Sequence, residues 1–190
     1  MVGDDDLAEA LKAAADGDDA GFAALWRALQ PPLLRYLRVV VGGAAEDVAS
    51  ETWLQATRDL QRFDGGPTAF RGWLFRIARH RAIDERRREA RRPEDAHDSV
   101  GSAIRWAAPD AATEAAESIS TAWALRIIAT LPPDQAEAVT LRVVAGLDVA
   151  TTARVLGKRP GSVRVATMRG LRRLATHPEV TAVGIQWGRV

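Results

Sequence analysis

Apolar residues recur at helical spacing along nearly the whole chain, and this pattern limits the folds that the chain can adopt. Alanine, leucine and arginine are abundant, whereas stretches that alternate between apolar and polar residues, as strands do, are few. Proline and glycine interrupt the pattern, for example at Pro31-Pro32, at Gly42-Gly43 and within residues 64–67. The sequence therefore predicts an all-α fold.

These interruptions divide the pattern into separate helices. We expect helices over residues 18–29, 31–41, 45–62, 69–90, 119–130, 133–145, 149–156 and 160–175. Residues 93–118 contain six acids and one arginine, together with Pro93, Gly101 and Pro109, which is typical of a linker. The expected organisation is an acidic N-terminal segment (1–17), a small helical domain (18–92), a flexible acidic linker (93–118), a second helical domain (119–176) and a tail (177–190).

Composition narrows the class of protein. The chain has 190 residues, of which 47% are hydrophobic, enough for one or two small domains with apolar cores. Cysteine is absent, which excludes disulfides and zinc–thiolate sites. The N-terminus is acidic, and no apolar run approaches the length of a membrane span. We therefore expect a cytoplasmic protein that does not insert into membranes.

Basic residues gather in two blocks. Residues 70–92 hold nine arginines and three acids, and residues 126–173 hold nine basic residues and three acids, although the net charge of the chain is only +1. Such excess positive charge attracts polyanions. Two basic blocks separated by acidic stretches indicate two polyanion-binding modules.

The first basic block, residues 70–92, has two faces when drawn as a helix. One side carries the apolar residues Phe70, Trp73, Leu74, Ile77 and Ala78, and the other carries Arg76, Arg79, His80 and Arg87. The pattern predicts a helix that buries one face and presents a cationic face.

The second basic block contains a helix-turn-helix pattern at residues 147–174. Asp148 is suited to cap a short helix, Gly157 to end it in a left-handed conformation, and Pro160 to open the next helix. We expect Val163, Thr167, Leu171 and Leu174 of that second helix to point inward. An ordinary helical hairpin with basic residues on its surface is the alternative interpretation.

Taken together, these motifs resemble a known family. The chain resembles a bacterial extracytoplasmic-function (ECF, group IV) RNA polymerase sigma factor. The residues that carry the resemblance are "AEDVASETWL" (45–54), "FRGWLFRIARHRAID" (70–84), "LPPDQAEAVTLRVVAGL" (131–147) and "GSVRVATMRGLRRL" (161–174). They follow one another in the family's order and spacing over about three quarters of the chain.

The resemblance implies two DNA-binding surfaces and one polymerase-binding surface. The −10 element of promoter DNA would be bound by Arg62, Phe63, Asp64, Gly65, Gly66, Pro67, Thr68, Phe70, Arg71, Trp73, Arg76, Arg79, His80 and Ile83. The −35 element would be bound by Lys158, Arg159, Ser162, Arg164, Val165, Met168, Arg169, Arg172 and Arg173. Core RNA polymerase would be bound by Glu46, Asp47, Ser50 and Glu51.

The resemblance also implies partners and the absence of a cofactor. Core polymerase would be contacted through the clamp helices and the flap of its large catalytic subunit, and an anti-sigma factor would hold the protein inactive. Ser50 and His80 depart from the family, which often has glutamine and commonly asparagine at these positions. Trp73 borders the apolar stripe, so packing in the core and contact with a base both remain open for it.

Two other functions compete with this interpretation. A metal-dependent enzyme would need more ligands than His80 and Asp84, which lie one helical turn apart, and the sequence offers no third ligand nearby. A conventional helix-turn-helix regulator with an N-terminal sensing or dimerisation domain would explain residues 147–174. A regulator of this kind would not account for the arginines and the tryptophan of residues 70–92.

Overall fold

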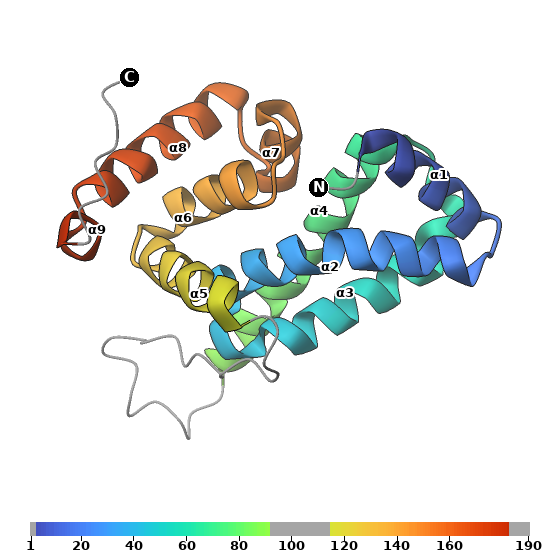
Figure 1. The fold of residues 1–190 in the computed structure, drawn as a ribbon, viewed down its shortest axis with the longest axis horizontal. Helices are drawn as coiled ribbons and strands as arrows, with labels where there is room; N and C mark the ends of the chain where they lie inside the picture. The colour runs from blue at the N-terminus through green and yellow to red at the C-terminus, as the bar shows by residue number, and fades with distance from the viewer. Residues whose placement is uncertain (1–2, 92–114, 183–190) are drawn as a thin grey trace.

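A computed structural model of the chain describes residues 3–91 and 115–182 (Figure 1). Almost all of these residues lie in helices or turns, and within these two ranges there is no strand, which confirms the all-α fold. Residues 93–114 of the predicted linker and 183–190 of the predicted tail lie outside the described residues. We call residues 3–91 the N-terminal unit and residues 115–182 the C-terminal unit.

The N-terminal unit consists of four α-helices and two short 3-10 turns. Its elements are α1 (Asp4–Ala15), α2 (Asp19–Val41), η1 (Gly42–Ala44), α3 (Ala45–Asp59), η2 (Leu60–Arg62) and α4 (Pro67–Glu89). The fully buried Tyr36 of α2 meets the ring of Phe75 of α4 edge to face, with ring centroids 5.6 Å apart. The predicted apolar face of α4 does not include Phe75, although this residue is buried.

Helix α2 contradicts the predicted break at Pro31-Pro32. It runs without interruption from Asp19 to Val41 and contains both prolines. Each proline removes a backbone donor from the helix, which favours a break. The buried leucines on both sides, Leu29 and Leu33, pack in the same core, and this tertiary packing outweighs the local preference.

Helix α1 occupies part of the predicted acidic N-terminal segment, where the sequence pattern predicts no helix. Leu7, Ala10, Leu11 and Ala14 are buried at helical spacing. The first turn of the helix is acidic throughout (Asp4–Asp6), and negative charge is favourable there. The helix packs mainly against α2 and also touches α4, so the acidic segment forms part of the N-terminal unit.

The C-terminal unit begins with α5 (Ala115–Ala129) and α6 (Pro133–Val139), which continues as the π-helical turn η4 (Thr140–Val144). The helix-turn-helix pair α7 (Val149–Leu156) and α8 (Pro160–Ala175) and the short α9 (Pro178–Ala182) follow. The predicted inward stripe of α8 is partly wrong. Val163 is buried as predicted, but Leu171 is exposed, and the buried Ala166 and Gly170 are not in the predicted stripe. Gly170 allows α8 to approach α6 so closely that a Cβ atom there would lie 2.6 Å from Val139 Cγ2.

The two units share apolar core residues, because each of the two buried apolar clusters contains residues of both units. The larger buried cluster contains Leu33 and Phe75 of the N-terminal unit and also Leu141 and Leu156 of the C-terminal unit. Helix α7 packs against α4, and α5, α6 and η4 pack against α2 (Figure 1). The N-terminal face of this contact is formed by α2 and α4, and α4 carries the first basic block.

Candidate nucleic-acid interfaces

Helix α4 separates its residues largely as the sequence predicts. Phe70, Leu74, Ile77 and Ala78 are buried, whereas Arg76, His80 and Arg87 are exposed. Trp73 is half-buried, and its ring centroid lies 5.1 Å from that of Phe63 and 5.5 Å from that of Phe70. These contacts favour packing as the main role of Trp73.

Phe63 holds the loop before α4 in place, and most of the loop residues that follow Phe63 are exposed. Phe63 packs edge to face on Phe70, with ring centroids 5.4 Å apart. Gly65 has a φ angle of +152°, and a Cβ atom there would lie 3.0 Å from the Phe63 ring and from Ala69 Cβ. Of the other residues of the predicted −10 surface, Arg62, Asp64, Gly65, Gly66 and Thr68 are exposed, and Pro67 and Ile83 are partly buried. The loop therefore presents backbone and small side chains beside the cationic helix.

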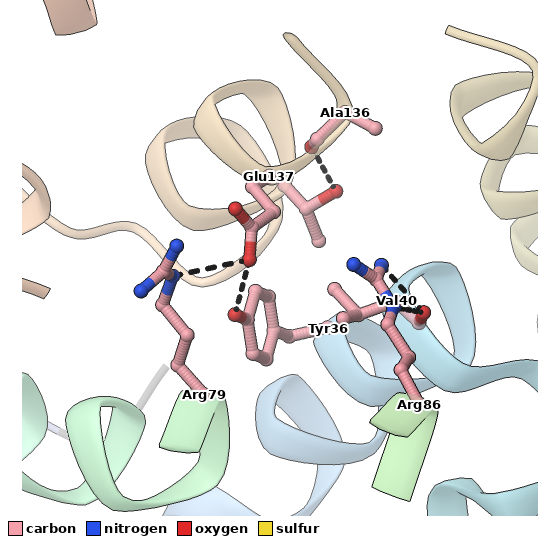
Figure 2. Close-up of polar contacts among 7 residues, drawn as sticks. Tyr36, Val40, Arg79, Arg86, Ala136 and Glu137 are labelled. Carbon is pink, nitrogen blue, oxygen red and sulfur yellow. Dashed lines mark hydrogen bonds and ion pairs between the residues drawn. The ribbon is translucent and has the colours of Figure 1, made fainter. Parts of the chain in front are cut away.

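Two arginines of the predicted −10 surface are paired with carboxylates from elsewhere in the chain. Arg71 Nη1 lies 2.7 Å from Asp4 Oδ1 of α1. Arg79 Nε lies 3.2 Å from Glu137 Oε1 of α6, in the C-terminal unit (Figure 2). Neither pair could be predicted from sequence patterns, because the partners are 67 and 58 residues apart.

Glu137 also accepts a hydrogen bond from the buried Tyr36 hydroxyl, with the two oxygens 3.2 Å apart (Figure 2). Burial raises the pKa of the Tyr36 hydroxyl well above its ordinary value, and the nearby carboxylate of Glu137 raises it further. Tyr36 therefore stays protonated and donates. Beside this group, the guanidinium of Arg86 donates two hydrogen bonds to Val40 O at the end of α2, at 2.9 and 2.7 Å (Figure 2).

The helix-turn-helix signals are confirmed. Asp148 caps α7, accepting hydrogen bonds from Thr151 N at 2.8 Å and from the Thr151 hydroxyl at 2.6 Å. The hydrogen bond from that hydroxyl lowers the pKa of the Asp148 carboxyl, so the capping group is a carboxylate at neutral pH. Gly157 ends α7 with a φ angle of 64°, and Pro160 is in the first turn of α8.

The outer face of α8 combines cations with apolar side chains. All nine residues of the predicted −35 surface are exposed, namely Lys158, Arg159, Ser162, Arg164, Val165, Met168, Arg169, Arg172 and Arg173. Val165, Met168 and Leu171 are 41%, 44% and 39% exposed. The sequence predicts that Leu171 points inward, but the structure places this residue on the outer face.

Helix α3 presents an acidic face. The four residues predicted to bind polymerase, Glu46, Asp47, Ser50 and Glu51, are all exposed. Leu54 follows on the same face at the next helical position and is 58% exposed. Leu54 is not among the predicted polymerase-binding residues. Its position three residues after Glu51 places it on the same helix face, so the sequence pattern could have included it.

Two further findings concern the alternative functions. His80 and Asp84 lie on the exposed side of α4, and in the described part of the chain no three metal-ligating side chains come together. None of the described helices has the length and the apolar character needed to span a membrane.

Comparison with known proteins identifies the two units. The family model Sigma-70 region 2 matches residues 25–92, and Sigma-70, region 4 matches residues 121–174. The ECF RNA polymerase sigma factor BldN of Streptomyces coelicolor is 34% identical over 89% of this chain, and the match spans 64% of that protein. The ECF RNA polymerase sigma factor ShbA of Streptomyces griseus subsp. griseus is 34% identical over 85% of this chain and 89% of that protein.

A solved structure shares the fold. The sigma factor RpoE of Bartonella quintana, crystallised with the anti-sigma factor NepR, matches with a TM-score of 0.65 at 21% identity. The match covers 87% of this chain and 98% of that chain. The order of the two regions and the identity with ShbA over most of its length show that this chain belongs to the ECF RNA polymerase sigma factors.

Proposed function

We propose that the chain binds core RNA polymerase, directs it to particular promoters through their −10 and −35 elements, and helps to open the DNA. The observation that carries this proposal is the pair of exposed cationic helix faces, on α4 and on α8. One lies in the part matched by region 2 and the other in the part matched by region 4. The two faces suit two separate contacts with one DNA duplex.

The α4 surface is proposed to bind the −10 element and the strand released from it. Arg76 and His80 stand exposed on the helix and are available to phosphates and base edges. The loop at 64–68 offers a place with little side-chain bulk where an unstacked base can be held. Phe63, packed against Phe70 and Trp73, fixes the position of this loop.

The α8 surface is proposed to read the −35 element from the major groove. Ser162, Arg164, Val165 and Met168 are exposed and lie in the first turns of the helix, the end that contacts bases in helix-turn-helix proteins. The apolar side chains of Val165 and Met168 match thymine methyl groups. Arg172 lies farther along the helix and suits phosphates.

The acidic face of α3 is proposed to dock on a basic surface of core polymerase, the clamp helices of the large subunit. Glu46, Asp47 and Glu51 supply charge that steers association, and the exposed Leu54 supplies an apolar anchor beside them. Region 4 would contact the flap. The protein acts in the cytoplasm, where polymerase and DNA are, performs no catalysis itself, needs no cofactor, and is restrained by an anti-sigma factor.

Run-off transcription tests this function. Purified core polymerase is incubated with genomic promoter fragments, with and without the chain. We expect transcripts of defined length only when the chain is present. If the chain bound the same fragments equally well without polymerase and produced no transcript, a helix-turn-helix regulator would replace the sigma factor as the explanation.

A further inference from the structure

The outer face of α8 has a central row of residues, opposite the side that packs in the core. The buried side is marked by Val163, Ala166 and Gly170. Helical spacing places four exposed positions opposite to these residues, namely Gly161, Val165, Met168 and Arg172. The first side chain of this row that donates a hydrogen bond is therefore Arg172, in the last turn of the helix.

Two large apolar side chains occupy the middle of this row. Val165 is 41% exposed and Met168 is 44% exposed. Leu171, at 39%, follows Met168 by one helical turn at the edge of the row, so three of the six exposed large apolar side chains in the described part of the chain belong to α8. Apolar side chains that gather on one exposed helix face indicate a binding surface, whereas scattered ones do not. We call Val165 and Met168 the apolar pair.

Cations border the apolar pair. Four arginines of α8 are exposed, namely Arg164, Arg169, Arg172 and Arg173. None of them pairs with a carboxylate of residues 3–91 or 115–182. An apolar protein surface alone would not match this charge. Duplex DNA matches both features, because its phosphates are anionic and its major groove displays the methyl groups of thymine.

Gly161 begins the row and lets the helix approach the bases closely. A Cβ atom at this position would meet no other described segment of the chain within 4 Å, and the φ angle of Gly161 is not positive. Neither packing nor backbone conformation therefore requires glycine here. A missing side chain in the first turn removes bulk that would hold the next turn away from the groove. Val165, one turn later, can then reach the base edges.

The chemistry of the apolar pair determines which feature of a base pair it can read. In the major groove thymine presents a methyl group and an acceptor, O4, whereas cytosine presents a donor, the N4 amino group. Neither Val165 nor Met168 carries a group that donates a hydrogen bond to O4. The apolar pair therefore responds to the methyl group at C5 and not to the atom bonded to C4. For such a surface, 5-methylcytosine is equivalent to thymine.

We infer that the apolar pair reads the 5-methyl group of pyrimidines in the −35 element, and that 5-methylcytosine can replace thymine there. A promoter with cytosine at such a position is then bound more tightly once that cytosine is methylated, so the chain responds to DNA methylation. This inference rests on the proposed function, because it assigns the outer face of α8 to the −35 element.

Base substitutions in the promoter test the inference with the wild-type chain. Holoenzyme is assembled from core polymerase and the chain on a promoter fragment that gives a run-off transcript. Deoxyuridine, which differs from thymidine only by the missing methyl group, replaces the thymines upstream of the melted region one at a time. We expect affinity to fall by about threefold or more at one or two positions, as the removal of a buried methyl group predicts.

A second pair of substitutions is made at a position where deoxyuridine weakens binding. Cytosine or 5-methylcytosine replaces thymine, with guanine in the opposite strand. We expect cytosine to bind about as weakly as deoxyuridine and 5-methylcytosine to regain most of the affinity. Equal affinity for thymine and deoxyuridine at every position, or for cytosine and 5-methylcytosine at the chosen one, would each overturn the inference.

Substitution of the apolar pair gives the matching test in the protein. Val165→Ala with Met168→Ala removes both side chains, and the fold should persist because both are exposed, which circular dichroism checks. This double variant should bind the thymine and deoxyuridine fragments equally. Arg172→Ala is the control, because it should weaken binding to both fragments and keep the wild-type ratio between them. A double variant that kept this ratio would also overturn the inference.

These readouts keep the two proposals apart. If the wild-type chain gave no polymerase-dependent transcript from any fragment, the proposed function would fail. If the wild-type holoenzyme transcribed and its affinity did not depend on any of the methyl groups, only the reading of methyl groups by α8 would fail.

Discussion

Helices α4 and α8 carry the two cationic faces of the molecule, but their arginines lie in different surroundings. Arg71 and Arg79 of α4 are each paired with a carboxylate from a distant part of the chain. Among the described residues, no carboxylate forms an ion pair with an arginine of α8. The α8 surface is open to a ligand as it stands, whereas two arginines of the α4 surface are already paired within the chain.

The apolar residues of the two helices also lie in different surroundings. On α4 the aromatic side chains of Phe70 and Trp73 pack with Phe63 and shape the loop. On α8 apolar side chains, among them Val165 and Met168, face outward. This contrast teaches that two basic blocks of similar charge suit different tasks, since one supports a loop suited to holding a separated strand and the other suits an intact groove.

The largest effect is expected from the α3 surface, because both helices are proposed to reach promoter DNA only with polymerase. Asp47→Arg together with Glu51→Arg reverses the charge of an exposed face and should leave the fold intact. We expect affinity for core polymerase to fall about 100-fold, since like charges across an interface cost several kcal/mol. Co-purification with core polymerase measures this. Wild-type yield of the complex would show that α3 is not the docking surface.

Replacement of the loop before α4 should impair promoter melting, which is assigned to the α4 surface, and leave DNA recognition by α8 unchanged. Residues 64–68 are exchanged for Ser-Gly-Asn-Ala-Ser, which keeps glycine at position 65, where the backbone requires it. Core binding and recognition by α8 should persist, while promoter melting should fall by about tenfold or more, because unstacked bases cost a few kcal/mol each. Permanganate reactivity of unpaired thymines measures the melting.

A pre-opened bubble template is the control for this loop. It removes the need for strand capture, so the loop variant should transcribe from it at close to the wild-type rate. Normal melting of closed promoters by the variant would mean that the loop is only a turn between helices.

Two substitutions in α8 should change promoter binding in different ways. Arg164→Ala should relax base preference at the upstream element by about 1–3 kcal/mol, because Arg164 lies at the reading end of the helix. Arg172→Ala should weaken binding across all sequences and reduce its salt dependence. Salt titrations of holoenzyme on matched and altered upstream elements distinguish the two. A uniform loss for Arg164→Ala would assign this residue to phosphate alone.

The smallest effect is expected at Arg71. Asp4→Asn removes the carboxylate that pairs with Arg71, and the pair is partly exposed, so the gain in promoter affinity should be below about 1 kcal/mol. Asp5→Asn is the matched control, because it makes the same charge change in the same turn of α1. The gain should shrink at high salt. Equal effects of the two substitutions would show that Arg71 responds to general charge and not to its partner.

Local signals explain what the sequence predicts correctly. Asp148, Gly157 and Pro160 determine the limits of α7 and α8 through caps and turns that involve only neighbouring residues. The cationic side of α4 follows from helical periodicity alone.

Long-range packing explains the features that sequence patterns do not predict. The continuity of α2 through Pro31 and Pro32 depends on a core built from several helices. The partners of Glu137 lie 101 and 58 residues away, so nothing near it in the sequence marks it as buried. Leu171 is exposed because the buried face of α8 is formed by Val163, Ala166 and Gly170, of which Gly170 lies close against α6. Each of these features can be predicted only when the fold is known.

Permanganate footprinting of promoter fragments with core polymerase, in the presence and absence of the chain, tests whether this protein opens promoters with polymerase. We predict that thymines near the transcription start become reactive only when both polymerase and the chain are present. Binding of the chain alone to these fragments, with no polymerase-dependent reactivity on any of them, would contradict the account.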